Sequence, residues 1–168
     1  MRYLAIAFAA ASLLTASSSI AAMQKGAKAP KPAATDVWQP AKTPTGGTSW
    51  KLLEQAKLND RTDKKSSIIY TKPTFPASVL ALNGKQVKVA GWMMPLDNAT
   101  KQKRWVMLGY PPGCPFHFHA LPNQYIEILS PAGVPINETK IFVMTGTMEL
   151  TGYDESGIFY RLKNARPG

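Results

Sequence analysis

The feature that most constrains the fold is a series of short segments in the second half of the chain, in which apolar and polar residues alternate. The segments lie at fairly even spacing, and proline, glycine or asparagine turn signals separate them. They do not alternate with helix-length segments, which disfavours a parallel α/β fold. We expect strands at 68–70, 86–94, 104–110, 124–129, 140–150 and 158–162.

Two glycines, Gly91 and Gly146, lie inside expected strands and have similar neighbours. Glycine within a strand often marks a bend at a barrel corner. Five or six short strands with such bends predict a mostly β protein, in the form of a small OB-like β-barrel that is closed or partly open.

A short N-terminal helix is expected in front of the barrel. Ser49 has the side chain of an N-cap residue, and apolar residues recur at helical spacing as far as about Leu58. The polar stretch 59–67 predicts a loop, and 78–82 predicts a helical turn or an extended piece. The basic run 101–104 (KQKR) is expected at the tip of a hairpin.

The first 22 residues have the pattern of a secretory signal peptide. Arg2 precedes the apolar run 3–14, and small residues then predict cleavage after Ala21 or Ala22. The run is too short for a stable transmembrane helix, which disfavours an uncleaved anchor. No other segment approaches the ~20 apolar residues that a membrane span needs. We therefore expect an exported protein with no transmembrane segment in its mature chain.

Residues 23–48 are rich in alanine, lysine, proline, threonine and glycine, which predicts a flexible linker before a barrel domain at 49–168. The chain has 20 basic and 10 acidic residues, a formal net charge of +10. The basic residues are scattered, as on a solvated surface, although such a surface also attracts anionic partners. We expect no nucleic-acid partner for an exported chain, and no familiar nucleotide-binding loop is present.

The one cysteine and both histidines of the chain fall within six residues, as Cys114, His117 and His119. A thiolate and two imidazoles form a partial ligand set for zinc or copper. The C-x₂-H spacing lets a turn direct two donors at one centre, and residues two apart in extended chain project to the same side. We expect these three to be metal ligands. The fourth position is open to water, to a group from another chain, or to a supporting residue, for which the candidates are Asn123, Glu127 and Met94.

Two other interpretations of this loop stay open. In one, Cys114 is a small buried apolar residue and the histidines bond to backbone carbonyls, so that the protein is a scaffold or partner-binding module. In the other, Cys114 is a reactive thiolate of a thiol-dependent enzyme, with Asn123 as an orienting group. The chain has no second cysteine to form a dithiol pair. We therefore favour a non-enzymatic role.

A distinctive set of phrases runs from about Phe75 to Leu162. It comprises Phe75-Pro76, LNGK at 82–85, VKVAGWMMPL at 87–96, Cys114, Pro122-Asn123-Gln124, VMTGTM at 143–148 and Tyr160-Arg161-Leu162. On these residues the chain resembles an exported bacterial family, domain of unknown function 3299.

The resemblance implies a periplasmic or lipid-anchored protein encoded beside ABC-transporter components and metal-binding exported proteins. This implies a partner in the cell envelope and a role in metal handling, with zinc as the expected metal. The family's loop carries either C-x-H or C-P-F-C, whereas this chain has C-P-F-H-F-H. His117 stands where the second cysteine of C-P-F-C would be, a replacement that keeps ligand capacity but removes a dithiol pair.

Overall fold

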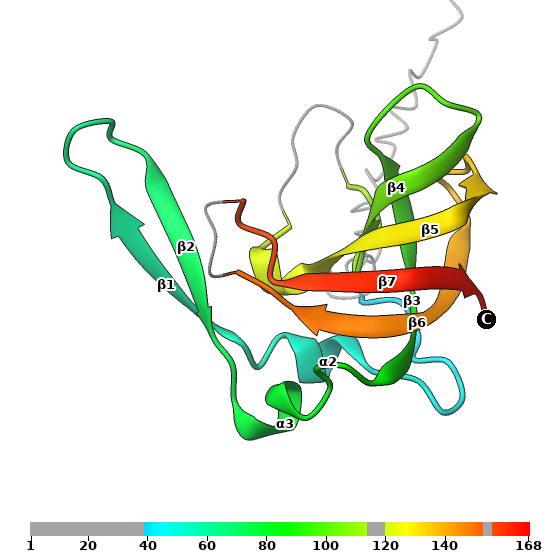
Figure 1. Ribbon diagram of the computed structural model, residues 1–168, viewed down its shortest axis with the longest axis horizontal. Coiled ribbons are helices and arrows are strands. Elements are labelled where there is room, and N and C mark those ends of the chain that lie inside the picture. The colour runs from blue at the N-terminus through cyan, green and yellow to red at the C-terminus, as the bar shows by residue number, and fades with distance from the viewer. Residues whose placement is uncertain (1–38, 114–119, 153–155) are drawn as a thin grey trace, which may run out of the picture. The chain divides into compact units, whose positions relative to one another are not determined.

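The computed structural model describes residues 39–113, 120–152 and 156–168 (Figure 1). The elements are α2 (Trp50–Leu53), β1 (Lys57–Thr62), β2 (Ile69–Thr74), α3 (Ala77–Leu80), β3 (Gln86–Pro95), β4 (Lys101–Leu108), the 3₁₀ turn η1 (Pro122–Gln124), β5 (Tyr125–Pro135), β6 (Ile141–Leu150) and β7 (Tyr160–Pro167). In this part of the chain, no helix is long and apolar enough to cross a membrane.

Five strands form a closed barrel in the order β3-β4-β5-β7-β6, with β6 pairing back to β3 (Figure 1). All neighbouring pairs are antiparallel except β5 and β7, which run parallel over a short stretch. A five-stranded barrel with crossed-over strands is the architecture of the OB fold. The prediction of a mostly β, OB-like barrel with a short helix before it is confirmed.

Alternation along the strands divides the barrel into an apolar interior and an outer face. In β5, for example, Ile126 and Ile128 are fully buried in the core, so Glu127 between them faces outward. The interior contains several flexible methionines and large rings, and the indole of Trp105 lies 5.7 Å from the ring of Phe142. The main core side chains are Val89, Met93, Trp105, Met107, Ile126, Ile128, Met144, Met148 and Leu162.

The two strand glycines, expected at bends of the barrel, lie where neighbouring backbone approaches closely. The register of β6 against β7 shifts between Thr145 and Thr147, so two residues of β7 face Gly146 alone. A β-carbon on Gly146 would lie 2.7 Å from the carbonyl oxygen of Lys163. A β-carbon on Gly91 would collide with the backbone of Leu108. Both positions therefore accept only glycine without a shift of the neighbouring strand.

The N-terminal helix is present but shorter than predicted. The Ser49 hydroxyl accepts a hydrogen bond from the Leu52 amide at 3.2 Å, which confirms Ser49 as the N-cap. The helix ends at Leu53 rather than near Leu58, because β1 begins at Lys57. Trp50 fixes the helix to the barrel: its ring is buried and its Nε1 donates to the Ala90 carbonyl at 2.7 Å.

The prediction of a loop over 59–67 is wrong in its first part, because Lys57–Thr62 forms strand β1. This strand pairs with β2 along its full length in a two-stranded ribbon. Its residues are polar because almost none of the ribbon is buried, and cross-strand side chains stabilise it instead. Asn59 Nδ2 donates to Thr74 Oγ1 at 2.9 Å, and Thr71 Oγ1 donates to Asp60 Oδ1 at 2.7 Å.

The basic run 101–104 is not a hairpin tip but the first part of β4. Gln102 explains this difference, since its side chain is fully buried and organises the preceding turn. Its Nε2 donates to Asp97 Oδ1 at 2.7 Å and to the Ala99 carbonyl at 2.8 Å. Lys101 and Gln102 pair with Pro135 and Val134 of β5, across a register shift that leaves residues 130–133 of β5 opposite Lys103 alone. Strand β5 therefore continues to Pro135 rather than ending at Leu129.

Part of the segment 23–48, expected to be a linker, packs against the barrel. Ala41 is buried, and its amide donates to the Gly109 carbonyl at 2.8 Å. The Thr48 amide donates to the Lys88 carbonyl at 2.7 Å. The packed chain thus begins by Ala41, before Ser49.

Replacement of Gly146 by alanine should destabilise the barrel by about 2 kcal/mol, because the added methyl group overpacks the β6–β7 bulge. Chemical denaturation of the purified protein measures this. Gly84→Ala is the comparison, since a methyl group there meets no atom within 4 Å but φ is +73°. Its loss should be about 1 kcal/mol, from backbone conformation alone. Unchanged stability of Gly146→Ala would contradict the packing described for this bulge.

Candidate functional site

The predicted ligands Cys114, His117 and His119 lie outside the described residues, in the connection between β4 and β5. The structure describes this connection on both sides, at 109–113 and 120–124. Within the described ranges, no three His, Cys, Asp or Glu side chains form a group that could hold a metal ion. The part of the candidate site that the structure describes is therefore the base of this loop, formed by these two flanks and the residues that bind them.

The two ends of the loop are bonded to each other. The Gly109 amide donates to the Gln124 carbonyl at 2.9 Å, and the Gly109 carbonyl accepts from the Ala41 amide. A β-carbon on Gly109 would lie 2.6 Å from the Trp50 ring, so the loop leaves β4 directly over α2. The chain therefore departs and returns at one fixed place on the barrel.

Asn123, one of the predicted supporting residues, fixes the returning end. Its side chain is 5% exposed, and its Nδ2 donates to the carbonyls of Glu54 and Ala56, both at 3.1 Å. These carbonyls follow the end of α2, where backbone acceptors have no partner within the helix. Asn123 Oδ1 is buried and has no hydrogen-bond partner in the described part of the chain. The amide group of Asn123 thus positions the loop on α2.

The Glu54 carboxylate connects both ends of the loop. Its Oε1 accepts a hydrogen bond from the Tyr110 hydroxyl at 2.6 Å and one from Gln124 Nε2 at 3.3 Å. Burial, followed by the interaction with Glu54, raises the pKa of Tyr110 to about 12, so the phenol remains a donor at neutral pH. Gln124 Oε1 in turn accepts from the Leu121 amide at 3.1 Å.

Sequence reasoning did not identify Glu54, Tyr110 or Gln124 as part of the site. Glu54 precedes the loop by more than 50 residues, and nothing local to it indicates a partner in the loop. The one available signal was the phrase Pro122-Asn123-Gln124, whose role is now apparent: it forms the turn η1 that returns the loop to α2.

Glu127, the second supporting candidate, is held by two arginines on the outer face of the barrel. Its side chain is 1% exposed, with Arg104 Nε 2.6 Å from Oε1 and Arg161 Nε 2.5 Å from Oε2. Burial alone would raise the pKa of the Glu127 carboxyl, but Arg161 and Arg104 outweigh it and hold the pKa below its usual range. Both carboxylate oxygens are thus engaged in ion pairs.

The ion pairs continue beyond Glu127 across the outer face. Arg161 Nη1 lies 3.1 Å from Glu149 Oε2, and Lys163 Nζ lies 2.5 Å from Glu149 Oε1. Lys163 and then Arg161 lower the pKa of the Glu149 carboxyl as well. The network joins β4, β5, β7 and β6, and it covers the short parallel pairing of β5 with β7.

Met94, the third supporting candidate, is half-buried near the end of β3 and pairs with Val106 of β4. Val106 pairs in turn with Glu127. Met94 and Glu127 therefore lie along one row of strand pairs, whereas Asn123 is bonded to the segment that follows α2. The structure does not bring the three supporting candidates into one site.

Comparison with known families supports the resemblance that the sequence suggests. A family described as "Protein of unknown function (DUF3299)" matches residues 23–164, most of the chain. The chain belongs to this family. A DUF3299 family protein from Pseudomonas aeruginosa, known from a crystal structure, is 19% identical. That match covers 57% of this chain and 67% of the other, with a TM-score of 0.45. No curated protein matches the chain.

Replacement of Asn123 by alanine should lower the free energy of unfolding by about 2 kcal/mol, because two buried carbonyls lose their donor. Asn123→Asp should cost more, since it places a carboxylate against those carbonyls. Urea denaturation measures both, with Asn98→Ala in the β3–β4 turn as an exposed control. The base described here would be contradicted if Asn123→Asp were as stable as the wild type.

Replacement of Glu127 by glutamine should lower stability by about 2 kcal/mol at pH 7, because bonds between charged partners are lost. The depressed pKa means that this contribution is present above pH 4.5 and disappears as the pH falls through the folded-state pKa. Stability measured from pH 7 to pH 2.5 should therefore show wild type and variant converging in acid. Glu138→Gln, at an exposed position without an ion pair in the described part, should change little. A constant difference at all pH values would contradict the assignment.

Proposed function

We propose that this DUF3299 protein is an exported, non-enzymatic metal-binding protein of the periplasm, which handles zinc or copper for an envelope transporter. Its ligands are Cys114, His117 and His119. One observation carries the proposal: the chain's one cysteine and both histidines fall within six residues, in a loop whose two ends are bonded together.

The donor set fits the proposed metals. Zinc accepts thiolate sulfur at about 2.3 Å and imidazole nitrogen at about 2.0–2.1 Å, and three protein ligands leave a fourth position open. Glu127 is not included in the set, because both of its oxygens bind arginines. Water or a donor from a partner is left for the fourth position, which suits a protein that takes up and releases its metal.

The base of the loop supports the proposal because it lowers the conformational entropy that metal binding would cost. Bringing three side chains to one ion requires the segment between them to lose conformational freedom. Closure of the loop at Gly109 and Gln124 has already removed part of that freedom, as have the bonds of Asn123 to the segment after α2. The folded protein thus begins nearer to the metal-bound state than an open peptide of the same sequence.

The expected export supports the same assignment. A free thiol in an oxidising compartment is exposed to oxidation, and this chain has no second cysteine with which to form an internal disulfide. A bound metal would hold Cys114 as a coordinated thiolate and limit its reaction with oxidants.

Purified protein titrated with Zn²⁺ or Cu⁺ should bind one ion per chain, and Cys114→Ser and His117→Ala should each weaken binding at least tenfold. Competition with a chromophoric chelator measures the affinity, and elemental analysis measures the stoichiometry. Metal should also slow the alkylation of Cys114 by iodoacetamide, because the coordinated thiolate is shielded.

Two variants serve as controls for this experiment. Met94→Leu and Glu127→Gln each remove a donor outside the proposed set, and they should bind metal as tightly as the wild type. Equal, near-zero metal in the wild type and in a Cys114→Ala/His117→Ala variant would overturn the proposal. Fast alkylation of Cys114 that metal does not slow would favour a thiol-dependent enzyme instead.

A further inference from the structure

Strands β5 and β7 are hydrogen-bonded over only part of their length, and their junction is called the seam here. The two strands pair over two rows, Glu127 with Arg161 and Ile128 with Leu162. Beyond these rows, β5 pairs only with β4 and β7 pairs only with β6 within the described sheet. Each strand therefore has an edge without ladder partners along 129–135 and 163–167, and the two edges face the same opening.

A bulge in β7 shapes one side of this opening. Lys163 pairs with Thr147 and Arg166 with Thr145, so Asn164 and Ala165 together face Gly146. Asn164 adopts φ +50°, a left-handed backbone conformation that residues other than glycine adopt infrequently. Bulges of this kind commonly redirect a side chain, and strained residues gather at binding sites. Here Asn164 lies beside the seam.

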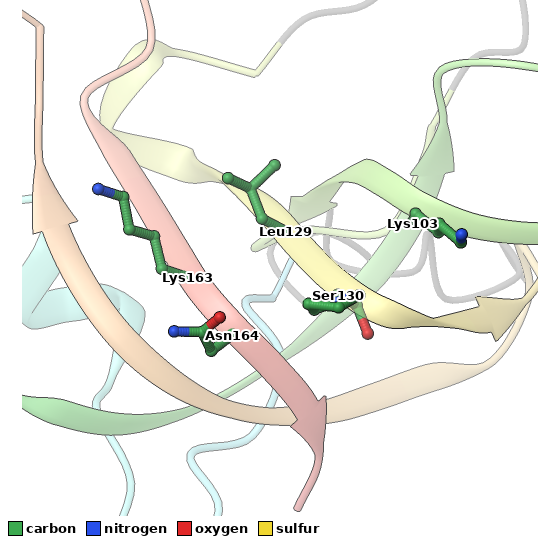
Figure 2. Close-up of a pocket in the computed structure, with 6 residues that line it drawn as sticks. Lys103, Leu129, Ser130, Lys163 and Asn164 are labelled. Carbon is green, nitrogen blue, oxygen red and sulfur yellow. The ribbon is translucent and has the colours of Figure 1, made fainter.

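The opening is a groove of about 320 Å³, a volume that suits a small ligand. Figure 2 shows Lys103 of β4 on one side of β5, and Lys163 and Asn164 of β7 on the other. Leu129 and Pro131 add apolar surface. Ser130 also lines the groove; it is 1% exposed, and its hydroxyl has no hydrogen-bond partner among the described residues. Because that hydroxyl is buried from solvent, it does not contribute to binding in the groove.

The charge around the groove is positive. Two of its lining residues, Lys103 and Lys163, are cations, and none of the six is acidic. Lys163 Nζ also lies 2.5 Å from Glu149 Oε1, so its charge is shared with the ion-pair network of Glu127 and Glu149. Every carboxylate oxygen of the pair already contacts a cation. Lys103 is exposed and has no ion pair within the described ranges, so its charge is available to a ligand.

We propose that this groove is an anion site that binds a phosphate group, with Lys103 and Lys163 as flanking cations and the Asn164 amide as a hydrogen-bond donor. Lysine binds phosphate as a point charge and does not require the planar geometry that arginine imposes. The apolar surface of Leu129 and Pro131 provides for the organic part of the ligand. The site involves none of the proposed metal ligands and is independent of the proposed function.

The phosphate group has two sources that experiment can separate. Purified full chain is titrated by calorimetry with inorganic pyrophosphate, and by co-sedimentation with phosphatidylcholine vesicles that contain or lack phosphatidylglycerol. Binding to pyrophosphate indicates a soluble phosphate ligand, whereas binding to phosphatidylglycerol vesicles alone indicates a lipid headgroup. Lys103→Gln/Lys163→Gln should weaken binding about tenfold in either case and lower its salt dependence.

The matched control is Lys64→Gln/Lys65→Gln in the β1–β2 turn, which removes the same charge away from the groove. It should bind as the wild type does. Asn164→Gly keeps every charge and relieves the positive φ, so it should fold at least as well and weaken binding several-fold. Equal weakening by both lysine pairs, unchanged binding by Asn164→Gly, or no binding to either pyrophosphate or phosphatidylglycerol vesicles would overturn the phosphate site.

Discussion

The structure depends on one short helix whose end offers backbone carbonyls to donors from the rest of the fold. Helix α2 is too short to be stable alone. Tyr160 of β7 donates to the Leu53 carbonyl at 2.6 Å, and Asn123 donates to the carbonyls of Glu54 and Ala56. Trp50 donates from the helix to β3. Neighbouring carbonyls at the end of the helix therefore hold it on the barrel, through Tyr160, and hold the candidate loop on the helix, through Asn123.

This arrangement gives the loop an unusual degree of support. Burial raises the pKa of Tyr160, so its hydroxyl remains a donor to Leu53 at neutral pH. Loops generally tolerate change because few bonds tie them to the fold. Here the ends of the loop are held by the buried amide of Asn123, the carboxylate of Glu54 and the ring of Trp50. The base therefore fixes where the loop leaves the barrel and where it returns.

The sequence predicted the barrel because alternation and strand glycines are local signals. It failed where the deciding partner lies elsewhere in the chain. The polar segment 59–67 contains most of β1 because β2 supplies its hydrogen bonds, and 101–104 begins β4 because a buried Gln102 forms the turn. The candidate site shows the same difference between local signals and partners that are distant in the sequence. The proposed ligands Cys114, His117 and His119 rest on their spacing in the sequence, whereas Glu54 and Tyr110 meet only after folding.

Strand β5 runs from the base of the proposed metal-binding loop to the proposed phosphate groove. It begins at Tyr125, next to the loop base, passes through Glu127 in the ion-pair network, and reaches the groove at Leu129 and Ser130. At about 3.3 Å per residue, four or five residues separate the loop base from the groove by roughly 15 Å. Substitutions that distant, with no shared partner, usually act additively. The Glu127 network lies between them and fixes the seam, so its loss would disturb the groove before it disturbed the loop.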